Sequence, residues 1–191
     1  MYFKKGKVLI ISAPSGSGKT TITKFLLSQN LNLAFSVSAC SRKKRQNEVD
    51  GVDYYFLDVK EFKKRIKNGD FLEWEEVYKN AFYGTLKNEV ETKLNSGKNL
   101  IFDIDVQGAS TLKNFFQKDS LSVYIDVPID IIEKRLRDRR TESEEGLVKR
   151  LKKTKEEGRN KNKFDVIVMN IDLKISKKEI LGRVKEYLQI N

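Results

Sequence analysis

Residues 13–20 have the types and spacing needed to hold a phosphate group. They read Ala-Pro-Ser-Gly-Ser-Gly-Lys-Thr, which is the phosphate-loop pattern GxxxxGK followed by Ser or Thr, with alanine in place of the first glycine. Gly16 and Gly18 allow backbone angles that turn successive N–H groups toward an anion, and the dipole of a following helix adds positive potential. We expect Lys19 to reach the β- and γ-phosphates of a nucleoside triphosphate, and Thr20 to offer its hydroxyl to Mg²⁺. The residues expected to line the triphosphate site are Ala13, Pro14, Ser15, Gly16, Ser17, Gly18, Lys19, Thr20 and Thr21.

The segments on either side of this loop are those that a phosphate loop requires. Residues 8–11 form a short apolar, largely β-branched run, which is typical of a buried parallel strand. After the loop, Ile22, Phe25 and Leu26 have the i, i+3, i+4 spacing of a helix with one buried face. A Gly/Ser-rich turn without special function is the alternative interpretation, but the order strand, loop, helix favours the phosphate site.

Composition excludes several kinds of chemistry. The 191 residues are enough for one core domain with room for insertions. Histidine is absent and Cys40 is the one cysteine, which excludes Ser–His and Cys–His triads, zinc sites with histidine ligands and disulfide scaffolds, and predicts a reducing, cytoplasmic location. No stretch approaches the roughly 18–20 apolar residues of a membrane span, so we expect a soluble protein with no membrane partner. The formal net charge of +11 suits polyanionic partners such as nucleotides or nucleic acid, although solvated lysines on every face would give the same value.

The rest of the chain alternates between strand-like and helix-like segments, which predicts a doubly wound α/β parallel sheet. Asp103 and Asp105 come at the end of an expected buried strand, where open parallel sheets bind their ligands. We expect residues 80–84 to form a turn and Ser176 to cap the last helix. The further expected strands are 52–57, 71–78, 99–105, 122–127 and 164–170; the further expected helices are 58–68, 85–95, 106–116 and two within 129–163.

Eight stretches along the chain carry a resemblance to one family. They are SAPSGSGKT at 12–20, FSVSACSRKKR at 35–45, GVDYYF at 51–56, FLEWEEV at 71–77, FYGT at 82–85, DIDVQG at 103–108, KRLRDRR at 134–140 and TESEEGLVKRL at 141–151. In this order they resemble the guanylate kinases, P-loop enzymes that transfer a phosphoryl group from ATP to GMP. At residues 41–48 the family usually has Thr-Arg-x-Pro-Arg-x-Gly-Glu; the proline and the glycine are missing here, while both arginines keep their spacing.

The resemblance implies the fold of a P-loop NTPase with three parts. The doubly wound nucleoside monophosphate kinase core would comprise residues 1–34, 98–128 and 164–191. A small mixed α+β insertion that binds GMP would cover residues 35–97, and a helical lid would cover residues 129–163.

The resemblance also implies a GMP site. Arg42 and Arg45 would bind the GMP phosphate through bidentate hydrogen bonds, together with the hydroxyls of Tyr54 and Tyr83. Glu73 would select guanine, because its carboxylate accepts from both N1–H and the 2-amino group and adenine has neither donor there. Taken singly, these residues have ordinary alternatives as core aromatics, a solvated basic loop and a surface acid; their register with the phosphate loop favours the site. The implied GMP residues are Ser38, Arg42, Arg45, Tyr54, Glu73, Tyr83, Thr85 and Asp105.

The resemblance assigns catalysis to Lys19 and three arginines of the lid. Arg135 and Arg139 lie four residues apart, on one face of an expected helix, and Arg150 lies on the next helix. The alternative for this segment is a charged, solvated helix surface.

The remaining assignments concern the metal, the base of ATP and the nucleophile. One of Asp103 and Asp105 would orient Mg²⁺ through water; we assign Asp103, with Thr20, to the metal and Asp105 to GMP. Asn170 is expected near the adenine of ATP. The phosphate oxygen of GMP is already ionised at neutral pH, so no general base is required.

The sequence therefore predicts a guanylate kinase that uses ATP with Mg²⁺ and accepts GMP and dGMP. A kinase for another monophosphate is disfavoured by the combination of Glu73, Ser38 and Thr85. A second alternative is a non-catalytic guanylate-kinase-like module that binds phosphopeptides, but such modules characteristically degrade the phosphate loop, which this chain retains. We expect no obligatory nucleic-acid partner, and a monomer or a homodimer.

Overall fold

A five-stranded parallel sheet forms the centre of the protein. The computed structural model describes residues 6–138 and 144–190. The central strand β1 (Val8–Ser12) pairs with β7 (Asn99–Ile104) on one side and β8 (Ser120–Asp126) on the other. The outer strands are β2 (Leu33–Phe35) and β9 (Val166–Met169), which gives the order β2-β7-β1-β8-β9. The parallel sheet predicted from the sequence is confirmed.

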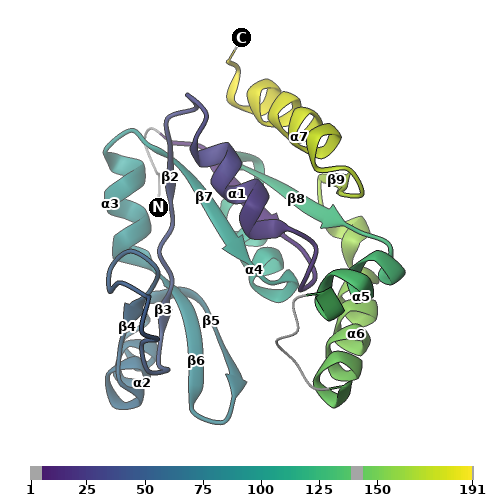
Figure 1. Cartoon of the computed structure of the whole chain (residues 1–191). Coiled ribbons are helices and arrows are strands. Elements are labelled where there is room, and N and C mark those ends of the chain that lie inside the picture. Colours follow the sequence, from purple (N-terminus) through teal and green to yellow (C-terminus); the bar gives the residue numbers. More distant parts are fainter. Residues whose placement is uncertain (1–5, 139–143, 191) are drawn as a thin grey trace.

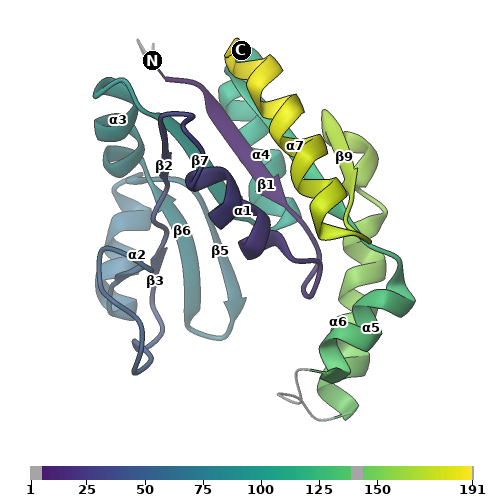
Figure 2. The same ribbon diagram turned by 45° about the horizontal axis from the view of Figure 1, so that its top comes forward.

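Helices cover both faces of this sheet, because successive residues of each strand point to opposite sides. Leu9 and Ile11 of β1 belong to the core beneath α1 (Lys19–Leu27) and α7 (Leu173–Leu188). Val8 and Ile10 belong to the opposite core, beneath α3 (Lys87–Asn95) and α4 (Val106–Phe116). Figure 2 shows α1 and α7 together on one side of β1. The sheet is doubly wound, as expected.

A second sheet of four strands forms, with one helix, what we call the small lobe. Its strands are β3 (Ala39–Cys40), β4 (Tyr55–Phe56), β5 (Phe71–Tyr78) and β6 (Ala81–Leu86), in the order β4-β3-β6-β5, and its helix is α2 (Val59–Lys67). Asp58 caps α2 by accepting a hydrogen bond from the Glu61 backbone N–H. The fully buried ring of Phe62 stacks on Phe71, with centroids 4.5 Å apart, and on Phe82, 5.5 Å apart.

Two helices form the remaining part, which we call the helix pair: α5 (Ile129–Asp138) and α6 (Glu144–Gly158). They pack together through buried Ile132, Leu136 and Leu147. The small lobe and the helix pair project on either side of the phosphate loop, beyond the same end of the central sheet (Figure 1). Short 3₁₀ helices span Gln117–Asp119 and Lys161–Lys163. None of the described helices is long and apolar enough to cross a membrane.

Three local expectations were wrong, each because a polar side chain or a hairpin decides the structure. Residues 81–84 belong to β6, and the turn is confined to residues 79–80, where Asn80 takes the left-handed φ of +60°. The strand expected over 52–57 shrinks to Tyr55–Phe56, because Asp53 binds the Val49 N–H and holds the preceding residues in a turn. The last helix is capped by Asp172, whereas the Ser176 hydroxyl donates to the Asp172 carbonyl inside the first turn.

The aromatic stack of the small lobe yields a stability prediction. Replacing Phe62 by alanine leaves a cavity between two rings and is expected to cost about 3–5 kcal/mol of unfolding free energy. Val52→Ala, at a side chain that is 62% exposed, serves as the control and should change stability by less than about 0.5 kcal/mol. Urea unfolding followed by circular dichroism measures both; equal midpoints for the two variants would contradict the packing role of Phe62.

Candidate active site

The phosphate loop has the backbone that its two glycines permit. Gly16 has a φ of +87° and Gly18 a φ of +89°, both in the left-handed region. Gly18 also sits against Asn170, because a Cβ added there would lie 2.7 Å from the Asn170 Nδ2 atom. Gly18 immediately precedes α1, so the loop delivers its N–H groups to the positive end of a helix.

Lys19 ties the loop to the carboxyl end of β7. Its Nζ atom lies 2.7 Å from Asp103 Oδ1 and donates to the Ile104 carbonyl at 3.0 Å. The side chains of Lys19 and Asp103 are 21% and 16% exposed, so the ammonium group is shielded but accessible from the cavity above the loop. The structure thus places Asp103, which the sequence analysis assigned to the metal, beside the lysine of the loop.

The cavity above the loop has a volume of about 430 Å³ and joins the three parts of the molecule. Besides the nine loop residues, its walls contain Tyr78 from the small lobe and Asp105 from the start of α4. From α6 come Arg150, Lys153, Thr154 and Glu157. The Arg150 guanidinium reaches the loop itself, where it donates to the Ser15 hydroxyl at 3.1 Å. The arrangement can surround a polyphosphate with a lysine and an arginine from opposite sides.

Mg²⁺ fits the donors at this end of the sheet. The exposed Thr20 side chain lines the cavity, and the Asp103 carboxylate lies beside Lys19. In residues 6–138 and 144–190 no three His, Cys, Asp or Glu side chains are grouped to hold a metal by themselves. One hydroxyl and one carboxylate suit Mg²⁺, because this ion keeps several water ligands and is bound by few protein groups together with substrate phosphates.

Arg135 and Asn170 both bind the backbone of the phosphate loop. The Asn170 side chain, which is 2% exposed, donates to the Ser17 carbonyl at 2.6 Å. The Arg135 guanidinium donates to the Asn170 carbonyl at 3.0 Å and to the Ser17 carbonyl at 3.5 Å. Both predicted residues are therefore brought to the loop, although Arg135 is not among the residues that line the cavity. The third predicted arginine of the helix pair, Arg139, lies outside the described residues.

In the small lobe, Arg42 is held by an acid that the sequence analysis did not single out. Its two terminal nitrogens bind the Glu48 carboxylate at 2.6 and 2.5 Å, and its Nε atom donates to the Tyr83 hydroxyl at 3.2 Å. The guanidinium also lies 5.0 Å from the centre of the Tyr54 ring. Hydrogen bonding to Arg42 lowers the pKa of Glu48 to about 2. Arg42, Tyr54 and Tyr83 thus form one group; Arg45 is exposed and gives its backbone N–H to Glu48.

Glu73 and Thr85 form the second group in the small lobe. The Thr85 hydroxyl donates to Glu73 Oε1 at 2.6 Å. Burial raises the pKa of Glu73 to about 7. The second carboxyl oxygen of Glu73, Oε2, faces Gly108, where an added Cβ would lie 3.3 Å from it. The Gly108 N–H donates to the Asp105 carboxylate at 2.8 Å. Ser38 lies at the start of the same lobe, and its carbonyl accepts from Tyr55.

Sequence reasoning missed Lys153, Glu157 and Tyr78 as residues of this site. All three line the cavity above the loop. The available signal was spacing: Lys153 and Glu157 follow Arg150 at i+3 and i+7, which places them on the same face of a helix.

Comparison with known proteins was made on sequence and on structure. The family model described as "Guanylate kinase" matches residues 5–190. A guanylate kinase of Bacteroides fragilis is 47% identical over 188 residues, which cover 98% of this chain and 92% of the relative. One from Salinibacter ruber is 43% identical over 182 residues, 95% of this chain and 96% of the relative. The crystal structure of guanylate kinase from Anaplasma phagocytophilum superimposes with a TM-score of 0.76 at 28% identity, over 95% of this chain and 86% of that one.

The close approach of Gly18 to Asn170 predicts a specific defect. In Gly18→Ala the new methyl group would meet the Asn170 amide, and the left-handed backbone would cost about 1–2 kcal/mol. We expect ATP affinity, measured by isothermal titration calorimetry, to fall at least about tenfold because the N–H groups turn away from the phosphates. The control is Gly182→Ala in α7, where a methyl group meets nothing within 4 Å and ATP affinity should be unchanged. ATP affinity in Gly18→Ala equal to that of the control variant would contradict the assigned loop geometry.

Proposed function

The chain belongs to the guanylate kinase family, and we propose that the family's reaction takes place between the phosphate loop and the small lobe. The protein is an ATP:GMP phosphotransferase, which moves the γ-phosphoryl group of ATP to GMP and yields ADP and GDP. One observation carries the proposed location: the first turn of α4 connects the two places. Asp105 lines the cavity above the phosphate loop, and Gly108, one turn later, lies against Glu73.

GMP would bind in the small lobe through its base and its phosphate. The ionised Glu73 carboxylate would accept from guanine N1–H and from the 2-amino group, while the hydroxyls of Thr85 and Ser38 approach O6. Because Gly108 has no side chain, the base could approach Glu73 closely. Arg42, ordered by Glu48 and Tyr83, would hold the phosphate together with Arg45 and Tyr54.

The donor triphosphate would lie on the phosphate loop. The N–H groups of residues 16–20 and the Lys19 ammonium would hold its β- and γ-phosphates, and Arg150 would approach from α6. Thr20 and Asp103 are the residues that would hold Mg²⁺, which would neutralise part of the charge of the phosphates. A phosphate oxygen of GMP is the nucleophile, so these residues have only to orient the two substrates and stabilise negative charge. Arg135 would act by fixing the loop; the role of Arg139 stays a prediction, as does a contact between Asn170 and adenine.

These assignments divide the chain into three parts with separate roles. We propose that residues 1–34, 98–128 and 164–191 are the core, residues 35–97 the GMP lobe and residues 129–163 the lid. The phosphopeptide-binding alternative is disfavoured because Lys19 and both loop glycines are present and correctly arranged. We also infer a cytoplasmic enzyme that is a monomer or a homodimer.

A parallel assay tests the reaction and the role of Lys19. With ATP and Mg²⁺, ADP formation should be rapid with GMP and at least about 100-fold slower with AMP, UMP or CMP. Lys19→Ala should lower kcat for GMP about 100- to 1,000-fold, because it removes a charge that stabilises the transferring group. A thermal unfolding curve shows whether this variant remains folded. Equal turnover of all four acceptors would refute the assigned base recognition, and a folded Lys19→Ala variant of normal rate would refute the assigned mechanism.

The raised pKa of Glu73 predicts how GMP recognition depends on pH. Below pH 7 the free enzyme carries a protonated Glu73, which presents a donor to a base that also donates, so kcat/KM for GMP should fall as pH decreases through about 7. Glu73→Gln should raise the KM for GMP about 30-fold or more at pH 8, since one acceptor becomes a donor. The variant should also lose the pH dependence due to Glu73. Measuring kcat/KM for both proteins from pH 5.5 to 9 tests this; superimposable profiles would assign base recognition to another residue.

A further inference from the structure

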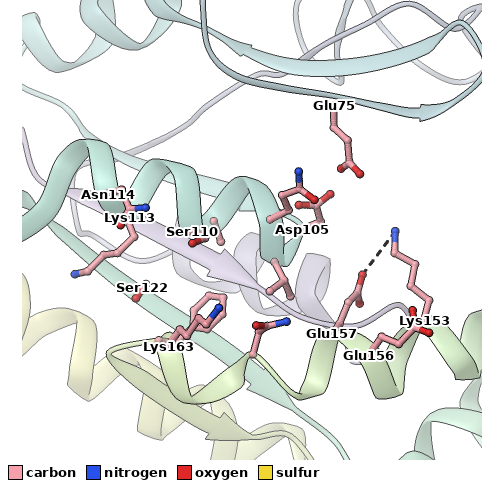
Figure 3. A pocket seen from close by; sticks show the side chains of 15 residues that line it. Glu75, Asp105, Ser110, Lys113, Asn114, Ser122, Lys153, Glu156, Glu157 and Lys163 are labelled. Carbon is pink, nitrogen blue, oxygen red and sulfur yellow. Dashed lines mark ion pairs between the residues drawn. The ribbon is translucent and has the colours of Figure 1, made fainter.

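A second cavity, of about 540 Å³, adjoins the phosphate cavity and lies between α4 and α6. The two cavities share Asp105, Lys153 and Glu157. At this shared end, side chains from all three parts of the molecule converge: Glu75 from β5, Asp105 from the start of α4, and Lys153 and Glu157 from α6 (Figure 3). The mechanism described above uses neither Glu75 nor Lys153.

Lys153 is held loosely on its own helix. Its ammonium group lies 3.7 Å from the Glu157 carboxylate, one turn further along α6. The Lys153 side chain is 60% exposed, whereas that of Glu157 is only 16% exposed. Because the Lys153 ammonium group is exposed and its contact with Glu157 is long, this i, i+4 pair contributes little to stability, and the lysine can exchange partners at low cost.

Glu75 extends toward Lys153 from the opposite side of the gap. In Figure 3 the Glu75 carboxyl group and the Lys153 ammonium group point toward each other, with Asp105 beside Glu75. A hydrogen bond with Asp105 raises the pKa of Glu75 to about 7; the charge of Lys153 acts in the opposite direction and that of Glu157 in the same direction. Lys153 thus faces Glu75, and its positive charge favours the ionised form of that carboxyl group.

The positions of these two residues connect the two halves of the active site. Glu75 is two residues from Glu73 on β5, so both side chains lie on the same face of the strand. Lys153 is three residues from Arg150 on α6, so both lie on the same face of the helix. A contact between Glu75 and Lys153 would fix the strand that selects guanine relative to the helix that brings an arginine to the phosphate loop.

We propose that Glu75 and Lys153 form an ion pair that holds α6 against the small lobe when both substrates are bound. Lys153 leaves Glu157 and Glu75 leaves Asp105 as the site closes, which phosphoryl transfer requires in order to exclude water. Both are positioning residues that act through Arg150 and Glu73. The proposal rests on the proposed function. The rival role for Lys153, direct binding of a phosphate, follows from its place in the wall of the phosphate cavity, and the experiments below distinguish the two.

The kinetic test is a double-mutant cycle at pH 8, where Glu75 is ionised. Glu75→Gln and Lys153→Met should each lower kcat/KM for GMP at saturating ATP about three- to tenfold, and the double variant should be no worse than either one. Lys153→Arg should retain most activity. Lys155→Met, which lines neither cavity, is the control. Multiplicative losses or the absence of any loss would overturn the ion pair. So would a rise in the KM for ATP, measured at saturating GMP, that Lys153→Met shows and Glu75→Gln does not.

Cross-linking tests the contact without turnover. Glu75→Cys and Lys153→Cys are combined in a chain whose one native cysteine, Cys40, is buried. Under a mild oxidant, disulfide formation should accelerate at least about fivefold when GMP and a non-hydrolysable ATP analogue are added together. The pair Glu75→Cys with Lys155→Cys should show no such acceleration. An unchanged cross-linking rate in protein that transfers phosphate to GMP would reject the ion pair while leaving the proposed function intact, whereas the absence of GMP turnover by the unaltered protein would reject the function.

Discussion

The contact of Lys19 with Asp103 and with the Ile104 carbonyl is the interaction on which the site depends. It fixes the phosphate loop to the end of the neighbouring strand β7, so that the loop following β1 and the residues ending β7 form one surface. Because β7 leads directly into α4, the same contact sets the position of Asp105 relative to the loop. A shielded ammonium group that already faces a carboxylate is also desolvated in advance, which lowers the cost of its meeting a phosphate.

The loop is held equally firmly from the other side of β1. Asn170 follows the edge strand β9, and its buried amide donates to the Ser17 carbonyl, while Arg135 binds carbonyl groups of both segments. The Ser17 carbonyl oxygen is thus bound by both side chains, while the Ser17 N–H donates to the Pro14 carbonyl within the loop. Contacts with β7, with the residue that follows β9 and with α5 therefore order the loop together. A displacement of α5 would change the conformation of the loop.

The features predicted correctly from the sequence depend on short motifs or on regular hydrophobic patterns along the chain. The phosphate loop has a fixed spacing of glycine and lysine, and the strand and helix beside it follow from hydrophobic pattern, so residues 8–27 were predicted correctly. The hairpin at Lys79–Asn80 was misplaced because its turn depends on one left-handed asparagine, while residues 81–84 read as a turn. Glu48 and Glu75 could not be recognised, because a charged residue looks solvated until the fold places its partner opposite; for Lys153 the one signal was its spacing from Arg150.

The pairing of Arg42 with Glu48 has a consequence for which anions the small lobe accepts. The Arg42 guanidinium binds the Glu48 carboxylate in bidentate geometry, so the two charges of this pair neutralise each other. A small monovalent ion such as chloride gains too little there to replace two charge-assisted hydrogen bonds. If Arg42 takes the phosphate of GMP as proposed, a dianion with more acceptor oxygens would compete with Glu48 better than chloride does. The proposed phosphate site would then be less sensitive to monovalent salt than an unpaired arginine.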